Sequence, residues 1–239
     1  LYDRSLPPLS RDRVVHVLER AAWLIRWVLG ESFDIQEWFT ECQNSPGTTI
    51  GTRYIDSSDT AKFLYPLTGT VDAISLFRQY LIWDTYLERS ISHRNLGSDE
   101  TRYRVVEGSR YTTVPKDNTK DRSIAIEPTL NMFLQQGFMG LIVKRLKDRC
   151  HLDLEVLQEK HKDLACSSSL TMSHATIDFS MASDSLSLEL CEILLPKKWY
   201  QYLTSVASNS IEVDGTNVLL PIISTMGNAT TFPLETLIF

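Results

Sequence analysis

The sequence has few cysteines and no long apolar run, and both absences narrow the class of protein. Its four cysteines, Cys42, Cys150, Cys166 and Cys191, include no CxxC pair, so a zinc ribbon or a redox pair is not expected. We expect free thiols in a cytosolic protein. The most apolar early stretch, AAWLIRWVLG, is interrupted by Arg26 and is too short to span a bilayer of about 30 Å. The sequence therefore predicts no membrane partner.

Several catalytic signatures are also absent. No HExxH or GxSxG motif is present, which excludes the zinc-protease and α/β-hydrolase signatures. The stretch SPGTTIGTR, residues 45–53, resembles a phosphate loop only loosely because it lacks the GK[ST] ending, so a structural loop is the better interpretation.

An overall excess of positive charge is missing too. The net charge of −6 argues against a simple basic coat for nucleic acid. Residues 101–150 are different, because they carry ten Lys or Arg against five Asp or Glu, a local charge of +5. The sequence therefore predicts one basic surface on an acidic body.

What is present indicates an ordered α+β protein. With 239 residues, 43% of them hydrophobic, the chain is long enough for one or two domains with a sizeable core. Apolar periodicity predicts helices over 10–30, 70–91, from Thr129 towards Arg149, over 197–208 and within TTFPLETLIF. Residues 31–60 are expected to be rich in loops, 92–101 to be exposed, and 150–173 to form a loop or a short helix.

Strand signals are shorter. RYRVV and RYTTV read as two strands around the turn EGS, and RSIAI reads as a further strand after the turn PKDNTKD. ATIDF predicts a short strand, followed by a helix capped by Ser183 or Asp184. IEVDGTNVLLPI predicts a hairpin with Asp214 and Gly215 at its turn.

The stretch ATIDFSMASDS contains the first candidate site, Asp178 with Asp184. A carboxylate at the carboxyl end of a strand projects past the sheet edge, and hard divalent cations take several oxygen ligands. One aspartate does not make a two-metal site, so a partner acid must come from elsewhere. The alternative is that Asp178 caps a turn and Asp184 caps a helix.

Two further groups could bind an anionic ligand. Arg110, Lys116 and Arg122 flank the turn of the basic hairpin and could clamp a triphosphate. Taken alone, they are better explained as a solvated turn, where Lys and Arg are common. In STMGNATTF, Gly227 would let the backbone approach a ligand while neighbouring polar groups offer hydrogen bonds. Those groups are Ser224, Thr225 and Asn228, and the alternative is an ordinary loop that caps a helix.

Taken in chain order, these motifs resemble one family. A hairpin reading SRYTTVPKDNTKDRSIAIEP is followed by NMFLQQG, ATIDFSMASDS, VDG and STMGNATTFPLETLIF. This series is similar to the replicase catalytic (beta) subunit of the leviviruses, the small positive-strand RNA phages. The match runs over about residues 103–239 and extends more weakly towards the amino terminus. The resemblance implies an RNA-directed RNA polymerase that moves nucleotidyl groups from NTPs to an RNA 3′-hydroxyl.

The resemblance also implies roles for the candidate residues. Asp178 lies in the equivalent of palm motif A and would be the catalytic metal ligand for Mg²⁺, with Mn²⁺ as a possible substitute. Asp184 would lie near the ribose, where the 2′-hydroxyl distinguishes RNA precursors. Arg110, Lys116 and Arg122 would form motif F and contact the nucleotide phosphates. The equivalent of motif B would contribute nucleotide-binding groups from Ser224, Gly227 and Asn228.

Two departures from the polymerase pattern are visible. The general motif B pattern is G-xxx-T-xxx-N, whereas this sequence has Gly227, Thr231 and Glu235, so Asn228 or Ser224 is a candidate substitute for the missing Asn. Motif C, a hairpin with adjacent aspartates, has no counterpart, because the sequence contains no Asp-Asp pair. We therefore expect a fragment, inactive alone, with motif C and the thumb absent.

The expected architecture is an incomplete right-hand polymerase fold. Residues 1–165 would form the fingers, including the motif F hairpin at about 103–126, and residues 166–239 would form part of the palm. RNA template and product, NTPs, host translation elongation factors and a ribosomal protein are the implied partners, in the cytoplasm of an infected bacterium. The alternatives are a non-catalytic RNA-binding protein that lacks motif C, and a reverse transcriptase.

Overall fold

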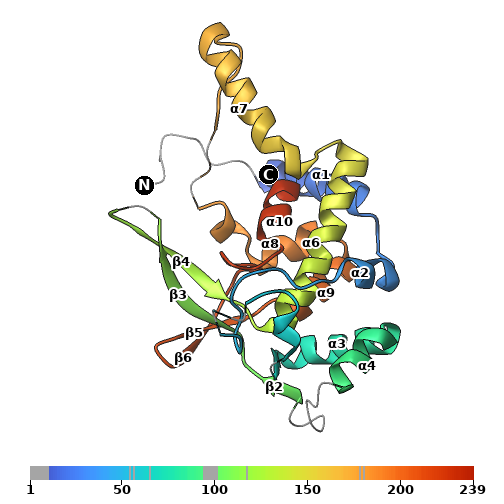
Figure 1. Cartoon of the computed structure of the whole chain (residues 1–239). Coiled ribbons are helices and arrows are strands. Elements are labelled where there is room, and N and C mark those ends of the chain that lie inside the picture. Colours follow the sequence, from blue (N-terminus) through green and yellow to red (C-terminus); the bar gives the residue numbers. More distant parts are fainter. Residues whose placement is uncertain are drawn as a thin grey trace.

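A long central helix organises the chain. The computed structural model describes residues 11–53, 55, 57–64, 66–93, 102–116, 118–177, 179 and 181–239. The helices of this part are α1 (Arg11–Leu29), α2 (Ile35–Glu41), α3 (Val71–Trp83), α4 (Thr85–His93), α6 (Thr129–Cys150), α7 (Leu154–Thr171), α8 (Leu188–Leu194), α9 (Lys197–Val206) and α10 (Thr231–Ile238), with the 3-10 helices η2 (Ala61–Leu64) and η3 (Ser183–Ser185). Helix α6 contacts α1, α2, α3, α9 and α10 (Figure 1).

Two β-sheets complete the mixed α+β fold. Strand β1 (Leu67–Gly69) pairs in parallel with β2 (Tyr103–Val105). The second sheet has the order β4-β3-β5-β6, made of β3 (Ser109–Pro115), β4 (Asp121–Ile126), β5 (Ser210–Val213) and β6 (Thr216–Leu219). Strand β3 is antiparallel to β4 and parallel to β5. The β3–β4 hairpin projects from the body of the molecule (Figure 1).

The predicted pairing of RYRVV with RYTTV is wrong, because β2 and β3 belong to different sheets. The chain leaves β2 at Val106, whose amide donates to Gly69 O at 3.0 Å. It then passes so close to β5 that a Cβ on Gly108 would lie 2.1 Å from Ser210 O. Glycine at this position lets β3 enter the second sheet beside β5.

Two helical regions also differ from the sequence prediction. Helix α2 lies within residues 31–60, which were expected to be rich in loops. Asp34 Oδ1 caps this helix by accepting from Gln36 N at 2.9 Å. The helix buries Trp38. The predicted helix over 70–91 is divided into α3 and α4 at Asp84. The Asp84 carboxylate caps the second helix by accepting from Leu87 N at 2.9 Å. The exposed stretch predicted at 92–101 lies mostly outside the described residues.

Residues 150–173 contain the 18-residue helix α7 rather than a loop or a short helix. Asp153 caps its start, and its carboxyl-terminal half projects from the body (Figure 1). At the serine-rich end, the hydroxyl groups find hydrogen-bond partners among the carbonyls of the same helix. Ser169 Oγ donates to Cys166 O at 2.7 Å, and Thr171 Oγ1 donates to Ser167 O at 3.0 Å.

The strand predicted for ATIDF is not found in its described residues, 175–177 and 179, and Asp178 lies outside them. The predicted cap at Ser183 or Asp184 is also wrong. Both residues lie in η3, and Ser187 caps α8 by accepting from Leu190 N at 3.1 Å. The predictions for 10–30, 197–208, the β5–β6 hairpin and the carboxyl-terminal helix are confirmed.

A row of buried polar side chains lies along the amino-terminal end of α6. Glu127, Asn131 and Gln135 recur every four residues, so they share one face of the helix and the turn before it. Asn131 Nδ2 donates to Val206 O at 3.0 Å, and its Oδ1 accepts from Thr70 N at 3.0 Å. The row therefore connects α6 to the start of α3 and the end of α9.

One hydrophobic core spans the described residues on both sides of the proposed boundary at 165. Phe33 lies at its centre, with edge-on ring contacts to Phe138 at 5.3 Å and to Trp199 at 4.9 Å. The division of the chain into fingers (1–165) and palm (166–239) therefore stays a prediction. No helix in the described ranges is both long enough and apolar enough to cross a membrane.

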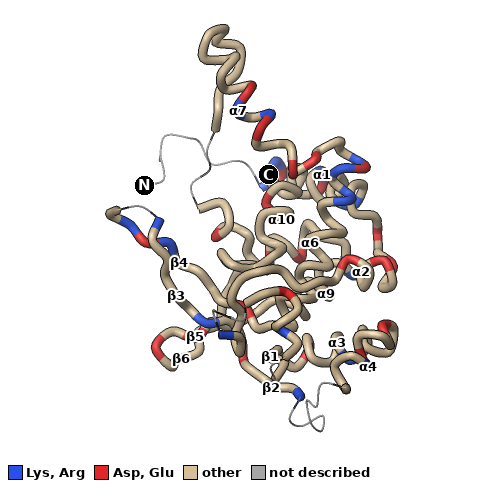
Figure 2. Tube along the Cα trace, in the orientation of Figure 1, with Lys and Arg blue, Asp and Glu red and all other residues tan. Residues whose placement is uncertain are grey.

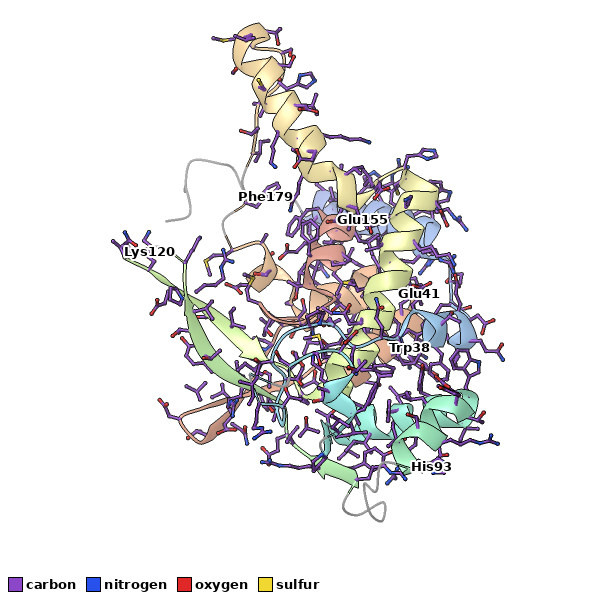
Figure 3. The ribbon with its side chains drawn as sticks, in the orientation of Figure 1. Trp38, Glu41, His93, Lys120, Glu155 and Phe179 are labelled. Atoms are coloured by element: carbon purple, nitrogen blue, oxygen red, sulfur yellow. The ribbon has the colours of Figure 1, made fainter. Side chains whose placement is uncertain are left out.

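Helix α2 packs tightly on α6 at two glycines, Gly137 and Gly140. A Cβ on Gly137 would lie 2.5 Å from Cys42 Sγ and 2.7 Å from Trp38 Nε1. A Cβ on Gly140 would meet Glu41, at 2.7 Å from the movable Oε2 and 3.0 Å from Cβ. Figure 3 shows Trp38 and Glu41 beside α6. Close packing therefore depends mainly on Gly137.

We predict that Gly137→Ala lowers the free energy of unfolding by about 2 kcal/mol, because the added methyl overpacks a rigid contact. Gly140→Ala is the matched control and should change it by less than about 1 kcal/mol, since Glu41 moves and alanine favours the helix. Urea denaturation of both variants measures the difference. Equal losses would contradict this view of the contact.

Candidate functional site

The three basic residues of the hairpin share one face. Opposed residues of antiparallel strands point the same way, and Arg122 of β4 is opposite Val114 of β3. Alternate residues along β3 also share a face, which places Arg110 with Val114. The ladder continues to Lys116, whose amide donates to Lys120 O at 3.0 Å. We call the face that carries Arg110, Lys116 and Arg122 the basic face.

The charges of the basic face are available to a ligand. Arg110, Lys116 and Arg122 are exposed, and none makes a salt bridge with a described carboxylate. Two carboxylates lie on or beside the hairpin. Glu212 of β5 is in register with Arg110. Asp121 is opposite Pro115 and therefore points away from the basic face. Figure 2 shows Lys and Arg along the hairpin, and Figure 3 places Lys120 at its tip.

The loop that contains Gly227 is fixed to the base of this hairpin. Ala125 N of β4 donates to Met226 O at 2.8 Å. Gly227 has φ +117°, and a Cβ there would lie 2.2 Å from Ala125 O and 3.2 Å from Ile124 Cγ2. Ile124 is two residues from Arg122 and therefore belongs to the basic face. The structure thus brings together two groups that the sequence predicted separately.

The other two predicted residues of this loop point inward. Asn228 is 8% exposed, and its Oδ1 accepts from Thr230 N at 2.8 Å and from Thr230 Oγ1 at 2.7 Å. Ser224 is 2% exposed, and its Oγ has no hydrogen-bond partner among the described residues. In this conformation both side chains shape the loop rather than face solvent.

Glu127, which is not among the candidate residues predicted from the sequence, is a buried carboxyl beside this loop. Ser208 Oγ donates to Glu127 Oε2 at 2.5 Å, and Gln135 Nε2 donates to it at 3.1 Å. Burial raises the pKa of Glu127 to about 7, while hydrogen bonds from Ser208, Gln135 and Asn228 lower it. A glutamate in an apolar run before proline was the available signal.

The stretch 45–53 lies against the same base. Ile50 N donates to Glu127 O at 2.9 Å, and Thr49 Oγ1 lies 2.8 Å from Thr129 Oγ1. A cavity of about 200 Å³ is lined by residues 45–49, Lys62, residues 124–127, Met132 and Gly227. Lys62 was not identified from the sequence. It is 1% exposed, its Nζ donates to Ser45 O at 2.6 Å, and burial lowers its pKa.

The acidic candidates are only partly described. Asp178 lies outside the described residues, and Asp184 is exposed in η3. Burial, and then the charge of Asp184, raises the pKa of Glu235 in α10, so these two carboxyls lie near each other. Phe179 stacks on Phe239 at 5.5 Å and joins its segment to the same helix. Within the described ranges, no three His, Cys, Asp or Glu residues form a metal-binding group.

We predict that Gly227→Ala destabilises the protein by about 3 kcal/mol, because it adds overpacking against Ala125 to the strain of a positive φ. Gly47→Ala is the matched control. Gly47 has φ +111° but open space around its Cβ position, so only the strain of about 1–2 kcal/mol should appear. Thermal unfolding distinguishes the two, and equal losses would mean that the contact with β4 contributes nothing.

Comparison with known proteins agrees with this arrangement of motifs. Residues 9–239 match the family described as RNA replicase, beta-chain. The RNA-directed RNA polymerase beta chain of Escherichia phage MS2 is 37% identical over 201 residues, which cover 84% of this chain and 36% of the relative. The beta subunits of Enterobacteria phage SP and Escherichia virus Qbeta are 35% and 34% identical over 232 and 230 residues. Each alignment covers 95% of this chain, and 37% and 36% of those relatives.

The chain thus spans a little over a third of the length of these relatives. The family match covers nearly all of it, including the basic hairpin and the Gly227 loop. The chain belongs to the RNA replicase beta-chain family.

Proposed function

We propose that this chain supplies the fingers and the first part of the palm of an RNA-directed RNA polymerase. The observation that carries the proposal is the contact between the Gly227 loop and β4, the strand that carries Arg122 of the basic face. A polymerase needs cationic groups beside the loop that positions its nucleotide, and the family membership indicates the same activity. The reaction is template-directed transfer of a nucleotidyl group from an NTP to an RNA 3′-hydroxyl.

In this proposal the basic face holds the triphosphate. Arg110 and Arg122 bind phosphate oxygens in pairs, whereas Lys116 acts as a point charge. Nucleotidyl transfer depends on positioning and on neutralising phosphate charge more than on covalent chemistry. Within the part of the chain that the structure describes, these three cations are exposed and make no salt bridge, which suits them to that task.

Asp178 is the proposed catalytic metal ligand. Carboxylate oxygens are the donors that Mg²⁺ prefers, and Mn²⁺ takes the same donors. The donor type at Asp178, with Asp184 six residues later, fits such an ion, and further acids from the motif C hairpin would complete the site. When bound, the metal pair supplies Lewis-acid stabilisation of the attacking and leaving oxygens.

Asp184 and Glu235 are proposed to contact the ribose. Glu235 occupies the position of the usual motif B asparagine, and it lies close enough to Asp184 for the two charges to interact. Ser224 and Asn228 point inward, so Glu235 replaces them as the candidate for this role. Burial, and then the charge of Asp184, raises the pKa of Glu235, and its side-chain oxygens can hydrogen-bond to a ribose hydroxyl.

The remainder of the palm, with motif C, and the thumb are proposed to lie against the segment that precedes η3. Ile177, Phe179 and Met181 are 78%, 60% and 72% exposed there, and a row of exposed apolar residues favours a covering element. RNA template and product, NTPs, host elongation factors and a ribosomal protein are the proposed partners, in the cytoplasm of an infected bacterium.

We predict that Asp178→Asn in the intact replicase abolishes RNA synthesis, because one negative charge at the metal site is lost. Asp214→Asn, at the exposed β5–β6 turn, is the matched control and should retain activity. Ribonucleotide incorporation with Mg²⁺ measures both. Retention of more than about 1% of the wild-type rate in Asp178→Asn would exclude its catalytic role.

We predict that Lys116→Ala raises the KM for NTPs about tenfold and leaves template affinity near the wild-type value, because a phosphate contact is lost. Lys162→Ala on α7, where Lys162 forms an exposed pair with nearby Glu159, should change neither constant. Steady-state kinetics and RNA binding measure both. If template affinity falls while the KM stays constant, the hairpin binds RNA instead.

Nucleotide selection separates the polymerase from its alternatives. Magnesium-dependent incorporation of ribonucleotides is expected here, incorporation of deoxyribonucleotides would indicate a reverse transcriptase, and RNA binding without incorporation would indicate a non-catalytic protein.

A further inference from the structure

Helix α1 carries a second surface that the core does not bury. The helix contacts α6, α8 and α10, and the side chains that pack into the core include Leu18, Ala21, Ala22, Ile25, Val28 and Leu29. Its two tryptophans point elsewhere, because Trp23 is 54% exposed and Trp27 is 47% exposed. Tryptophan offers a large contact area to a ligand, so two exposed tryptophans on one helix indicate a binding surface.

The exposed side chains of this surface recur every seven residues, which is close to two turns of an α-helix. They form three neighbouring rows. The middle row is Arg13, Arg20 and Trp27, the row on one side is His16 and Trp23, and the row on the other side is Val17 and Leu24. All of these residues are exposed, and we call them the α1 face.

The α1 face has positive charge and no acidic side chain. The acids of the helix, Asp12 and Glu19, lie beyond the row of His16, on the side away from the arginines. Arg13 and Arg20 form no salt bridge with any carboxylate in the described part of the chain. Both charges are therefore available to an anion.

Each tryptophan of the α1 face lies next to a cation. The Arg20 guanidinium lies over the Trp23 ring, with its Cζ 5.8 Å from the ring centroid. Arg149, which is exposed in the last turn of α6, donates from Nη1 to Trp27 O at 3.1 Å. Aromatic rings beside guanidinium groups are typical of surfaces that bind single-stranded nucleic acid.

The order of the rows favours RNA over a membrane or a second helix. A helix that lies on a membrane or packs against another helix has apolar side chains along the middle of its contact face and charges at the edges. In the α1 face the arginines occupy the middle row, and aromatic or apolar side chains lie on both sides. Phosphates and bases match that arrangement, because arginines pair with phosphates and tryptophans stack on bases.

We propose that the α1 face binds single-stranded RNA at a site separate from the proposed nucleotide site. Arg13 and Arg20 hold phosphates, Trp23 and Trp27 stack on bases, and Arg149 extends the site. Phosphate contacts and stacking read no particular sequence, so the site holds the strand rather than selecting it. Figure 1 shows α1 apart from the β3–β4 hairpin, so this inference goes beyond the proposed polymerase activity.

Hydroxyl-radical footprinting of the intact replicase tests the proposal without nucleotides or turnover. The probe is a single-stranded RNA of about eight nucleotides, within the range of sites that bind by stacking. Mass spectrometry measures the oxidation of Trp23 and Trp27 as the RNA concentration rises. Both residues should be oxidised in the free replicase and protected when RNA is added.

Substitutions on α1 test whether the face itself binds the strand. Trp23→Ala should raise the RNA concentration that half-protects Trp27 by at least about fivefold, because a stacking contact is lost. Combining Arg13→Gln with Arg20→Gln should reduce the slope of log affinity against log salt by about 1.4, because two phosphate contacts are lost. If neither value changes, the proposal is overturned.

Arg26→Gln is the matched control. Arg26 lies on the same helix but outside the α1 face, where it pairs with Glu31 at 3.1 Å. Its substitution should change neither the half-protecting concentration nor the salt slope. Effects as large as those of the face variants would show that the net charge of the helix, rather than the α1 face, determines binding.

Three further results would overturn the proposal. Tryptophans that resist oxidation in the free replicase would show that another part of the protein covers the face. Oxidation that RNA does not reduce would show that no RNA binds there. Protection by vesicles of anionic phospholipid, but not by RNA, would assign the face to a membrane surface.

This test and that of the proposed function have separate outcomes. Protection by RNA without ribonucleotide incorporation would contradict the polymerase activity alone. Incorporation without protection of the tryptophans would overturn only the RNA site on α1.

Discussion

The buried polar row of Glu127, Asn131 and Gln135 is the constraint on which the rest of the described structure depends. Each of these groups would destabilise the core if it were left without a partner, so each specifies the segment that lies opposite it. Asn131 specifies the start of α3 and the end of α9, and Gln135 specifies the end of α9 and the loop after Gly227. Apolar packing alone would allow these segments to slide against α6.

The same buried polar row helps to fix the base of the projecting β3–β4 hairpin against the rest of the fold. Strand β4 ends at Ile126, the residue before Glu127, and the Gly227 loop contacts β4 at Ala125. The basic face is thus rigid at its base and free of ion pairs along its described length. Its positive side chains can therefore bind a ligand without first breaking an ion pair with a described residue.

Much of this could be predicted from the sequence because it depends on neighbours in the chain. The β3–β4 hairpin, the β5–β6 turn and α6 follow from turn residues and apolar periodicity. The pairing of β2 could not be predicted, since it depends on contact with β1, far away in the sequence. Helix α7 was not predicted because a serine-rich composition favours caps and turns over helix interiors, whereas the structure continues the helix to Thr171.

The features of the candidate site also fall into those that the sequence predicted and those that only the structure shows. The sequence by itself determined the family, through the order of its motifs, and placed Arg110, Lys116 and Arg122 on one hairpin and Gly227 in a loop. Only the tertiary structure decided that this loop rests on the hairpin, that Ser224 and Asn228 face inward, and that Glu127 lies beneath them. The physical reason is that burial and partner distance are properties of the packed chain, whereas turn chemistry and periodicity are properties of adjacent residues.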